Sequence, residues 1–120
     1  MTPDAFRRLA LALPEAHEAP HFERTSFRVG KKIFATLVPD GGEAMIKLPV
    51  AEEAEDWIAA RPELFFSYGT WTTRNGALGV RLARAPAKLL QPLLVEAWRA
   101  IAPKRALAAF DGGAGGRSAR

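Results

Sequence analysis

The sequence contains no cysteine, and that absence excludes whole classes of site. Disulfides, thiolate metal centres, cysteine nucleophiles and iron–sulfur clusters all need this residue. Long apolar runs are missing as well: residues 9–13 form a short apolar stretch, whereas a membrane-spanning helix needs roughly 18 residues and a signal peptide has a longer apolar core. We therefore expect a soluble, cytoplasmic protein with no membrane partner.

Catalytic motifs are as scarce as cysteine. None of the three serines stands in a Gly-x-Ser-x-Gly elbow, and the Gly-rich stretch after Asp111 lacks the Lys-Ser/Thr of a phosphate-binding loop. His17 and His21 have the spacing of two zinc ligands on a helix, but Pro20 lies between them and disfavours a helix. We expect no metal, no cofactor and no catalytic residue; a weaker alternative is an enzyme with His21 as its general base.

The length and composition are those of one globular domain. The chain has 120 residues, of which 48% are hydrophobic and 25% charged, values that favour a single buried core over disorder. We predict a single domain over residues 1–110, followed by a flexible Gly/Arg tail over residues 111–120.

The charge is spread unevenly along the chain. The formal net charge is +4; residues 1–73 carry 8 Lys and Arg against 11 Asp and Glu, and residues 74–120 carry 9 against 2. The halves therefore have net charges of −3 and +7. Such asymmetry is a hint of a polyanionic partner, because Lys and Arg release condensed counterions from a phosphate backbone. An ordinary solvated basic surface is the alternative interpretation.

The N-terminal segment predicts a helix. Thr2 is typical of an N-cap, and Pro3 is typical of the first helical position. Apolar residues then recur at helical spacing as far as Leu13, and Pro14 ends the pattern. Residues 15–23 show no clear period and predict a loop.

Residues 25–48 predict three strands, the first and third of which alternate, with turns at Gly30-Lys31 and over residues 39–42. Pro49 ends the third strand, and residues 50–60 predict a second helix.

The C-terminal half predicts a loop, a hairpin and a helix. Residues 61–69 predict a loop, and Asn75-Gly76 predicts the turn of a second hairpin that joins residues 71–73 to residues 78–82. Residues 87–102 predict the last helix. Pro92 implies that this helix is kinked or begins only near Gln91.

The order α-βββ-α-ββ-α predicts an α+β two-layer sandwich, in which helices cover one face of an antiparallel sheet. If Val29, Ile46, Leu48, Val80 and Leu82 point toward the core, the residues beside them in the sequence point to the opposite face of the sheet. Those neighbours are Arg28, Lys47 and Arg81. A slip of one residue in register would reverse this prediction.

The three tryptophans differ in context. Trp57 and Trp98 lie on the apolar sides of predicted helices, so we expect them in the core. For Trp71 we also expect packing against the core or an edge, and the alternative is that a nucleobase stacks on it next to Arg74.

Several blocks together resemble the MmcQ/YjbR family of small bacterial proteins, over about residues 2–107. The blocks are His21-Phe22, Ser26–Leu37, Lys47-Leu48-Pro49, Gly76–Leu82, Ala97-Trp98-Arg99 and Ala102–Arg105. The resemblance implies a frataxin-like (CyaY-like) fold and a DNA-binding function with a double-wing arrangement of hairpins.

Two departures accompany the resemblance. Ala77 stands where relatives often carry an aromatic residue. Frataxins bind iron through an acidic first helix, whereas Asp4 is accompanied here by Arg7 and Arg8, so iron binding is not implied.

Charge and resemblance favour a non-enzymatic DNA-binding protein that contacts phosphates through a basic sheet face and hairpin tips, without sequence preference. The candidate nucleic-acid-binding residues are Arg28, Lys31, Lys32, Lys47, Arg74, Arg81, Lys104 and Arg105. The alternative is a protein-interaction or small-ligand-binding module, which would use residues 17–22 and the aromatic residues of 65–71.

Overall fold

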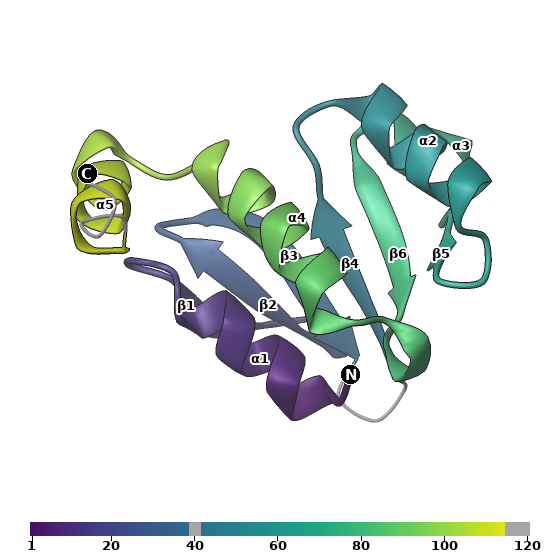
Figure 1. Ribbon diagram of the computed structural model, residues 1–120, viewed down its shortest axis with the longest axis horizontal. Coiled ribbons are helices and arrows are strands. Elements are labelled where there is room, and N and C mark those ends of the chain that lie inside the picture. Colours follow the sequence, from purple (N-terminus) through teal and green to yellow (C-terminus); the bar gives the residue numbers. More distant parts are fainter. Residues whose placement is uncertain (39–41, 115–120) are drawn as a thin grey trace.

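A computed structural model describes residues 1–38 and 42–114 of the chain, with side chains as far as residue 112, as an α+β fold (Figure 1). The strands are β1 (His17–His21), β2 (Arg24–Val29), β3 (Lys32–Val38), β4 (Glu43–Lys47), β5 (Phe65–Phe66) and β6 (Ala77–Arg81). The α-helices are α1 (Pro3–Leu11), α2 (Ala51–Ala60), α3 (Thr70–Arg74), α4 (Ala87–Arg99) and α5 (Lys104–Ala109). A 3-10 turn over Leu82–Arg84 and a π-helical turn over Phe110–Ala114 complete the described elements.

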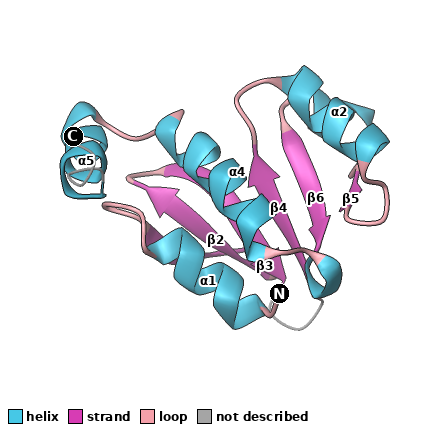
Figure 2. Ribbon diagram, in the orientation of Figure 1, coloured by secondary structure: helices cyan, strands magenta, loops and turns pink. Residues whose placement is uncertain are grey.

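The six described strands form one antiparallel sheet in the order β1-β2-β3-β4-β6-β5. Helices α1 and α4 lie side by side across one face of this sheet (Figure 2). The predicted α+β class with an antiparallel sheet is therefore confirmed.

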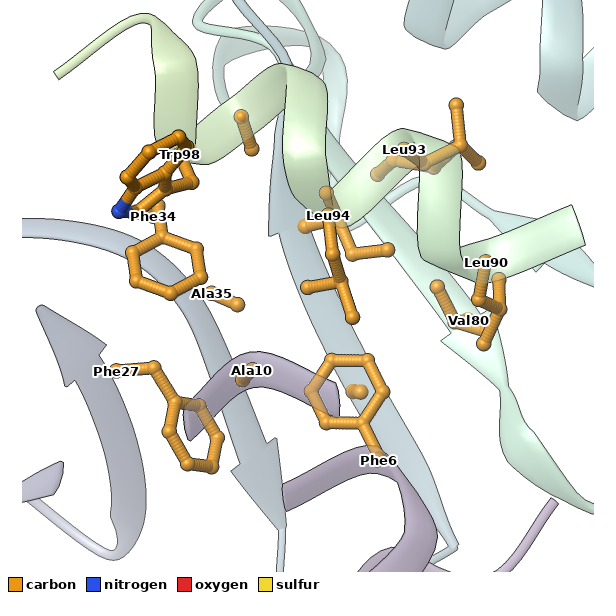
Figure 3. Close-up of a cluster of buried hydrophobic side chains, with 14 of the residues drawn as sticks. Phe6, Ala10, Phe27, Phe34, Ala35, Val80, Leu90, Leu93, Leu94 and Trp98 are labelled. Atoms are coloured by element: carbon orange, nitrogen blue, oxygen red, sulfur yellow. The ribbon is translucent and has the colours of Figure 1, made fainter. Parts of the chain in front are cut away.

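The core lies between this sheet and the two helices. Phe6 of α1, Phe27 of β2 and Phe34 of β3 are fully buried together with Trp98 of α4 (Figure 3). The indole Nε1 of Trp98 also donates a hydrogen bond to the Pro14 carbonyl at 3.0 Å, which satisfies the one polar atom of this ring. Trp98 is thus a core residue as predicted.

Helix α1 begins as the sequence predicts, because Thr2 Oγ1 accepts a hydrogen bond from the Ala5 backbone N–H at 3.1 Å. Helix α2 and strands β2, β3 and β4 also lie within or close to their predicted ranges. Trp57 of α2 is only half-buried, and its ring packs at 5.5 Å from the ring of Phe65.

The prediction of a loop over residues 15–23 is wrong. Residues His17–His21 form β1, which pairs with β2 at the edge of the sheet. An edge strand with exposed residues on both sides shows no alternation of burial, and proline is tolerated there. Pro20 therefore fits within a strand, although the sequence reads as a loop.

The predicted hairpin around Asn75-Gly76 is also wrong. Residues Thr70–Arg74 form the short helix α3, and Gly76, at φ +86°, joins that helix to β6. The outer neighbour of β6 is the two-residue strand β5, which precedes α3 in the chain. The predicted order α-βββ-α-ββ-α is therefore wrong, because it lacks β1 and has a strand where α3 lies.

Helix α4 begins at Ala87, as the predicted range does, and continues through Pro92, so the alternative of a start near Gln91 is excluded. Pro92 is exposed, and the hydrogen bond that it cannot make lies on the solvent side of the helix. None of the described helices combines the length and the hydropathy that a bilayer crossing requires. Residues 39–41 of the predicted turn at 39–42 lie outside the described residues. The same is true of residues 115–120 of the predicted tail at 111–120.

Candidate functional site

The strand registers divide the sheet into a helix-covered face and an opposite face, which we call the outer face. On β4, Ala44 and Ile46 are buried beneath the helices, and Met45 between them points to the outer face. One row of paired residues crosses all six strands on the outer face: Ala19, Ser26, Thr36, Met45, Gly79 and Phe66. Most of these side chains are small, so the surface of the outer face is recessed along this row.

Two adjoining hollows of about 260 and 420 Å³ lie on the outer face and form one groove. They share the lining residues His21, Thr36, Met45, Thr72 and Ala77. Arg24 and Tyr68 line one end of the groove; Ile33, Lys47, Trp71 and Asn75 line the other. No acidic side chain is among these lining residues, so the charged groups of the lining are cationic.

Helix α3 forms one wall of the groove and is held by a compact set of hydrogen bonds. The Gly69 carbonyl accepts from the hydroxyls of Thr72 at 2.9 Å and Thr73 at 3.1 Å. Asn75 Nδ2 donates to the Trp71 carbonyl at 2.8 Å. These bonds fix the backbone from which the Trp71 side chain projects.

Trp71 is 75% exposed, so the expectation that it packs against the core or an edge is wrong. In α3 the buried position belongs to Thr73, whose hydroxyl lies 2.6 Å from that of Ser67. Because Trp71 lies two residues earlier on the same short helix, its ring points to the groove instead.

The turn between β1 and β2 borders the groove on the other side. Phe22 in this turn is 93% exposed and has a left-handed backbone with φ +59°. Its ring contacts that of His21, which lines the groove, at a centroid distance of 4.9 Å. A bulky residue with positive φ and no apolar cover is uncommon and marks a candidate functional position.

Arg24 organises the floor at one end of the groove. Its guanidinium donates to Thr36 Oγ1, to the Tyr68 hydroxyl and to Glu43 Oε1 at 3.2–3.3 Å, and it lies 5.1 Å from the centre of the Tyr68 ring. Burial raises the pKa of Tyr68, and the Arg24 guanidinium opposes this shift. Tyr68 is therefore a neutral phenol near pH 7.

Five of the predicted nucleic-acid-binding residues lie around the other end of the sheet. Lys47 is exposed and lines the groove, and its register partner Ala77 lies just beyond the end of α3. Arg74 is exposed at the C-terminal end of α3, and Lys31 and Lys32 are exposed at the turn between β2 and β3. Arg28 projects from β2 on the outer face, two strands or about 10 Å from Lys47, whereas Lys32, the register partner of the buried Val29, projects on the helix-covered side.

Arg28 and Arg81 share the outer face with Lys47, as the register argument predicts, but both guanidinium groups already have partners. Arg28 donates to Ser26 Oγ at 2.8 Å and to the Pro20 carbonyl at 3.3 Å. Arg81 donates to the Pro62 and Phe65 carbonyls and lies over the Phe66 ring. The strand-register partner of Arg81 is Glu43, which lies about 13 Å from Lys47 along β4.

Lys104 and Arg105 are exposed on α5. The Arg105 guanidinium donates two hydrogen bonds to the Glu15 carboxylate, at 2.7 and 2.8 Å, so its charge is already compensated. Neither residue lines the groove.

The cation at one end of the groove, Arg24, went unrecognised in the sequence. The alternation that places Arg28 on the outer face extends back to Arg24, and a strand prediction that began one residue earlier would have included it. Tyr68 belongs to the aromatic residues of 65–71 that the sequence assigns to the alternative function, although the segment after β5 has no periodicity that would show which face it joins.

The two histidines do not form a common site. His17 and His21 both lie on the outer side of β1, where they pair with Arg28 and Arg24. Four residues along a strand separate their Cα atoms by about 13 Å, too far for two ligands of one metal ion. In the described part of the chain, no three His, Asp or Glu side chains cluster as metal ligands do.

A further hollow, of about 460 Å³, lies on the helical side between Pro49 and the exposed side of α4. Glu96 lines it, and a hydrogen bond with Glu53, together with burial, raises the pKa of Glu96 to about 7. Hydrogen bonding between two carboxyl groups requires a proton, which accounts for the direction of this shift.

Comparisons with known proteins give the family. No curated protein matches the chain. Among solved structures, the Deinococcus radiodurans protein DR2400, described as carrying the domain DUF419, is similar in fold, with a TM-score of 0.69 and 24% sequence identity over 87% of this chain and 80% of that one. The YjbR family model matches residues 11–100, three quarters of the sequence. The chain therefore belongs to the YjbR family.

Proposed function

We propose that this YjbR-family protein is a non-enzymatic, DNA-binding protein that contacts the phosphate backbone through the outer face of its sheet. The observation that carries the proposal is the groove around Lys47: the ammonium group is exposed, and no carboxylate lines the hollow. A polyanion gains most from a cation that no protein acid has already neutralised.

The neighbouring cations support the same partner. Lys31 in the turn between β2 and β3 and Arg74 on α3 are exposed around the end of the sheet at which Lys47 lies, whereas Lys32 pairs with the buried Val29 and so projects on the helix-covered side. The positions of Lys31 and Arg74 favour contacts to a chain of phosphates rather than to one anion. We propose that they position the nucleic acid without reading its bases.

The remaining predicted residues have smaller roles in this proposal. Arg81 and Arg105 are held by protein groups, and Arg28 is held in part. Lys104 lies on α5, outside the groove. The hairpin tip that contributes is the turn between β2 and β3, because the second predicted hairpin does not exist.

A binding role fits the groove better than a catalytic one. His21 supplies the imidazole of the lining, and its ring contacts the Phe22 ring. In the described part of the chain, its imidazole has no hydroxyl or carboxylate partner of the kind that prepares a nucleophile. The frataxin-like (CyaY-like) fold implied by the resemblance is likewise part of the proposal, supported by two adjacent helices on one face of an antiparallel sheet.

The second candidate is a small-ligand-binding module. The groove joins the two segments that the sequence singled out for this alternative: His21 comes from residues 17–22, and Tyr68 and Trp71 come from residues 65–71. The larger hollow is also within the usual size of small-molecule sites, about 300–1,000 Å³.

Fluorescence anisotropy with labelled DNA over a salt series from about 50 to 200 mM tests the proposal. We expect binding that weakens steeply with salt, and we expect Lys47→Glu to weaken it and to reduce the salt slope by about one. The matched control is Lys88→Glu, which makes the same change of charge on the exposed side of α4.

Two results would contradict the proposal. One is the absence of DNA binding at the lowest salt, which would leave the small-ligand alternative. The other is an equal loss of affinity in Lys47→Glu and Lys88→Glu, because net charge alone would then account for the binding.

A further inference from the structure

Two large aromatic side chains are exposed in the described part of the chain, and both border the groove. Trp71 is 75% exposed and lines it; Phe22 is 93% exposed and follows the lining residue His21. The other described Phe and Trp rings are buried or half-buried. Exposed rings that gather at one hollow, beside a cation, point to a ligand with flat faces and negative charge.

The Trp71 ring is held on a rigid support. The backbone carbonyl of Trp71 accepts a hydrogen bond from Asn75 Nδ2. In the preceding turn, the hydroxyls of Ser67, Thr72 and Thr73 form hydrogen bonds with the Gly69 backbone. A ring presented from a fixed backbone loses little conformational entropy when a ligand stacks on it.

The groove is concave, and this shape discriminates between nucleic acids. Its floor extends across β3, β4 and β6, which is two strand spacings or about 10 Å. In a duplex the bases are stacked inside, so proteins read them with a protruding helix or ribbon. A hollow with an aromatic wall instead fits a single strand, whose base faces are free to stack.

The floor beneath the ring is suited to a base and a phosphate at once. Ala77 and Thr72 are small and leave room next to Trp71, and Lys47 lies in the same hollow. Lys47 and Ala77 are register partners on adjacent strands, so their Cα atoms are about 5 Å apart. The base that stacks on the Trp71 ring and the phosphate that contacts the Lys47 ammonium group can therefore belong to the same nucleotide.

We propose that the groove binds single-stranded nucleic acid, with a base stacked on Trp71 and the adjoining phosphate at Lys47. This inference rests on the proposed function and narrows it from nucleic acid in general to an unpaired strand. The recognition is by stacking and charge, so it is tolerant of base sequence.

The test compares labelled ~12-nucleotide oligothymidine, oligouridine and a mixed-sequence DNA duplex of the same length, at one salt concentration. We expect the single strands to bind more tightly than the duplex. We expect Trp71→Ala to weaken single-strand binding by about 5- to 150-fold, the effect of losing one stacked base, and Trp71→Phe to weaken it less. The ratio of oligothymidine to oligouridine affinity distinguishes DNA from RNA as the preferred strand.

Exposed residues supply the controls. Val50 is 49% exposed and does not line the groove, so Val50→Ala should bind like the unaltered protein. Because Trp71 is exposed, we expect Trp71→Ala to keep the melting temperature of the unaltered protein. A stacked base should also quench tryptophan fluorescence in the unaltered protein and fail to do so in Trp71→Phe, since Trp98 is buried and Trp57 packs on Phe65.

The outcomes separate this inference from the proposed function. Equal affinity for duplex and single strand, with Trp71→Ala unchanged and Lys47→Glu weakened, would overturn the stacking site and leave phosphate binding intact. No binding of any of the three nucleic acids would overturn both. Weakening by Trp71→Ala for the single strands but not for the duplex is the result that supports the inference.

Discussion

The aromatic ring of Phe66 lies directly over Gly79, its register partner on β6, so that a Cβ atom at residue 79 would come within 2.6 Å of the ring. The Arg81 guanidinium lies over the same ring, 4.9 Å from its centre. Glycine is therefore required at this point of β6 for the close approach of a side chain rather than for its backbone freedom.

We expect Gly79→Ala to displace the Phe66 ring and to lower the free energy of unfolding by about 1–3 kcal/mol, as overpacking does. Urea unfolding measures this loss. In the double variant with Phe66→Ala, the clash partner is gone, so the combined loss should be smaller than the sum of the two single losses. Strict additivity would show that the two residues do not interact.

Gly76 is required for a different reason. It has φ +86°, and a Cβ atom there would overlap the backbone carbonyl of Leu48, whose N–H donates to the Gly76 carbonyl at 2.8 Å. Backbone atoms yield less readily than a side-chain ring, so Gly76→Ala should destabilise the fold more than Gly79→Ala. Thermal unfolding of both variants checks the order, and a higher melting temperature for Gly76→Ala would contradict it.

Trp98 is expected to stabilise the fold through its indole N–H as well as its volume. Trp98→Phe leaves the Pro14 carbonyl without its donor, which alone costs about 1–3 kcal/mol of unfolding free energy. The matched control is the same chemical change at an exposed ring, Trp71→Phe, which should stay within about 0.5 kcal/mol of the unaltered protein. Similar losses in both variants would mean that the hydrogen bond does not contribute.

The Glu53–Glu96 pair predicts a pH dependence of stability. In the unfolded chain Glu96 releases its proton near 4.5, its ordinary value, whereas the folded protein holds the pKa of Glu96 at about 7. The folded state therefore binds more protons in this window, and the free energy of unfolding falls as the pH rises from about 4.5 to about 7.

Denaturant unfolding at a series of pH values measures the slope, and Glu96→Gln should flatten it within that window. Glu55→Gln, at an exposed acid of α2, should leave the slope as it is. An unchanged slope in Glu96→Gln would exclude the shared proton as its origin.

Arg105 contributes to the net charge of the sequence, but its guanidinium is paired with a carboxylate of the protein. Its guanidinium is held by both oxygens of Glu15, and we expect Arg105→Gln to bind DNA with nearly unchanged affinity and salt slope. Anisotropy measurements beside Lys47→Glu test this expectation. If Arg105→Gln were the weaker binder, the interface would have to include α5.

The sequence correctly predicts the features that follow from residue alternation in strands and from helix capping. Period two along β2, β4 and β6 places Arg28, Lys47 and Arg81 on one face, and Thr2 marks the start of α1. Burial repeated every second residue is a strong signal because one register slip would expose the whole core face.

The groove could not be predicted in the same way. It depends on β1, an edge strand without alternation, and on α3, a five-residue helix that ends at an Asn-Gly pair typical of hairpins. Whether a cation is free also depends on partners distant in sequence: Glu15 lies 90 residues from Arg105, and Arg24 reaches Tyr68 across 44. Local patterns carry no information about such pairs.

The two edges of the sheet have a consequence for the protein in concentrated solution. One edge is β1, a five-residue strand that contains Pro20, and the other is β5, which is two residues long. A second chain extends a sheet by pairing with a long uninterrupted row of N–H and C=O groups, and neither edge offers one. The architecture that exposes a broad sheet face to a ligand thus resists strand addition by other copies, the usual first step of β-aggregation.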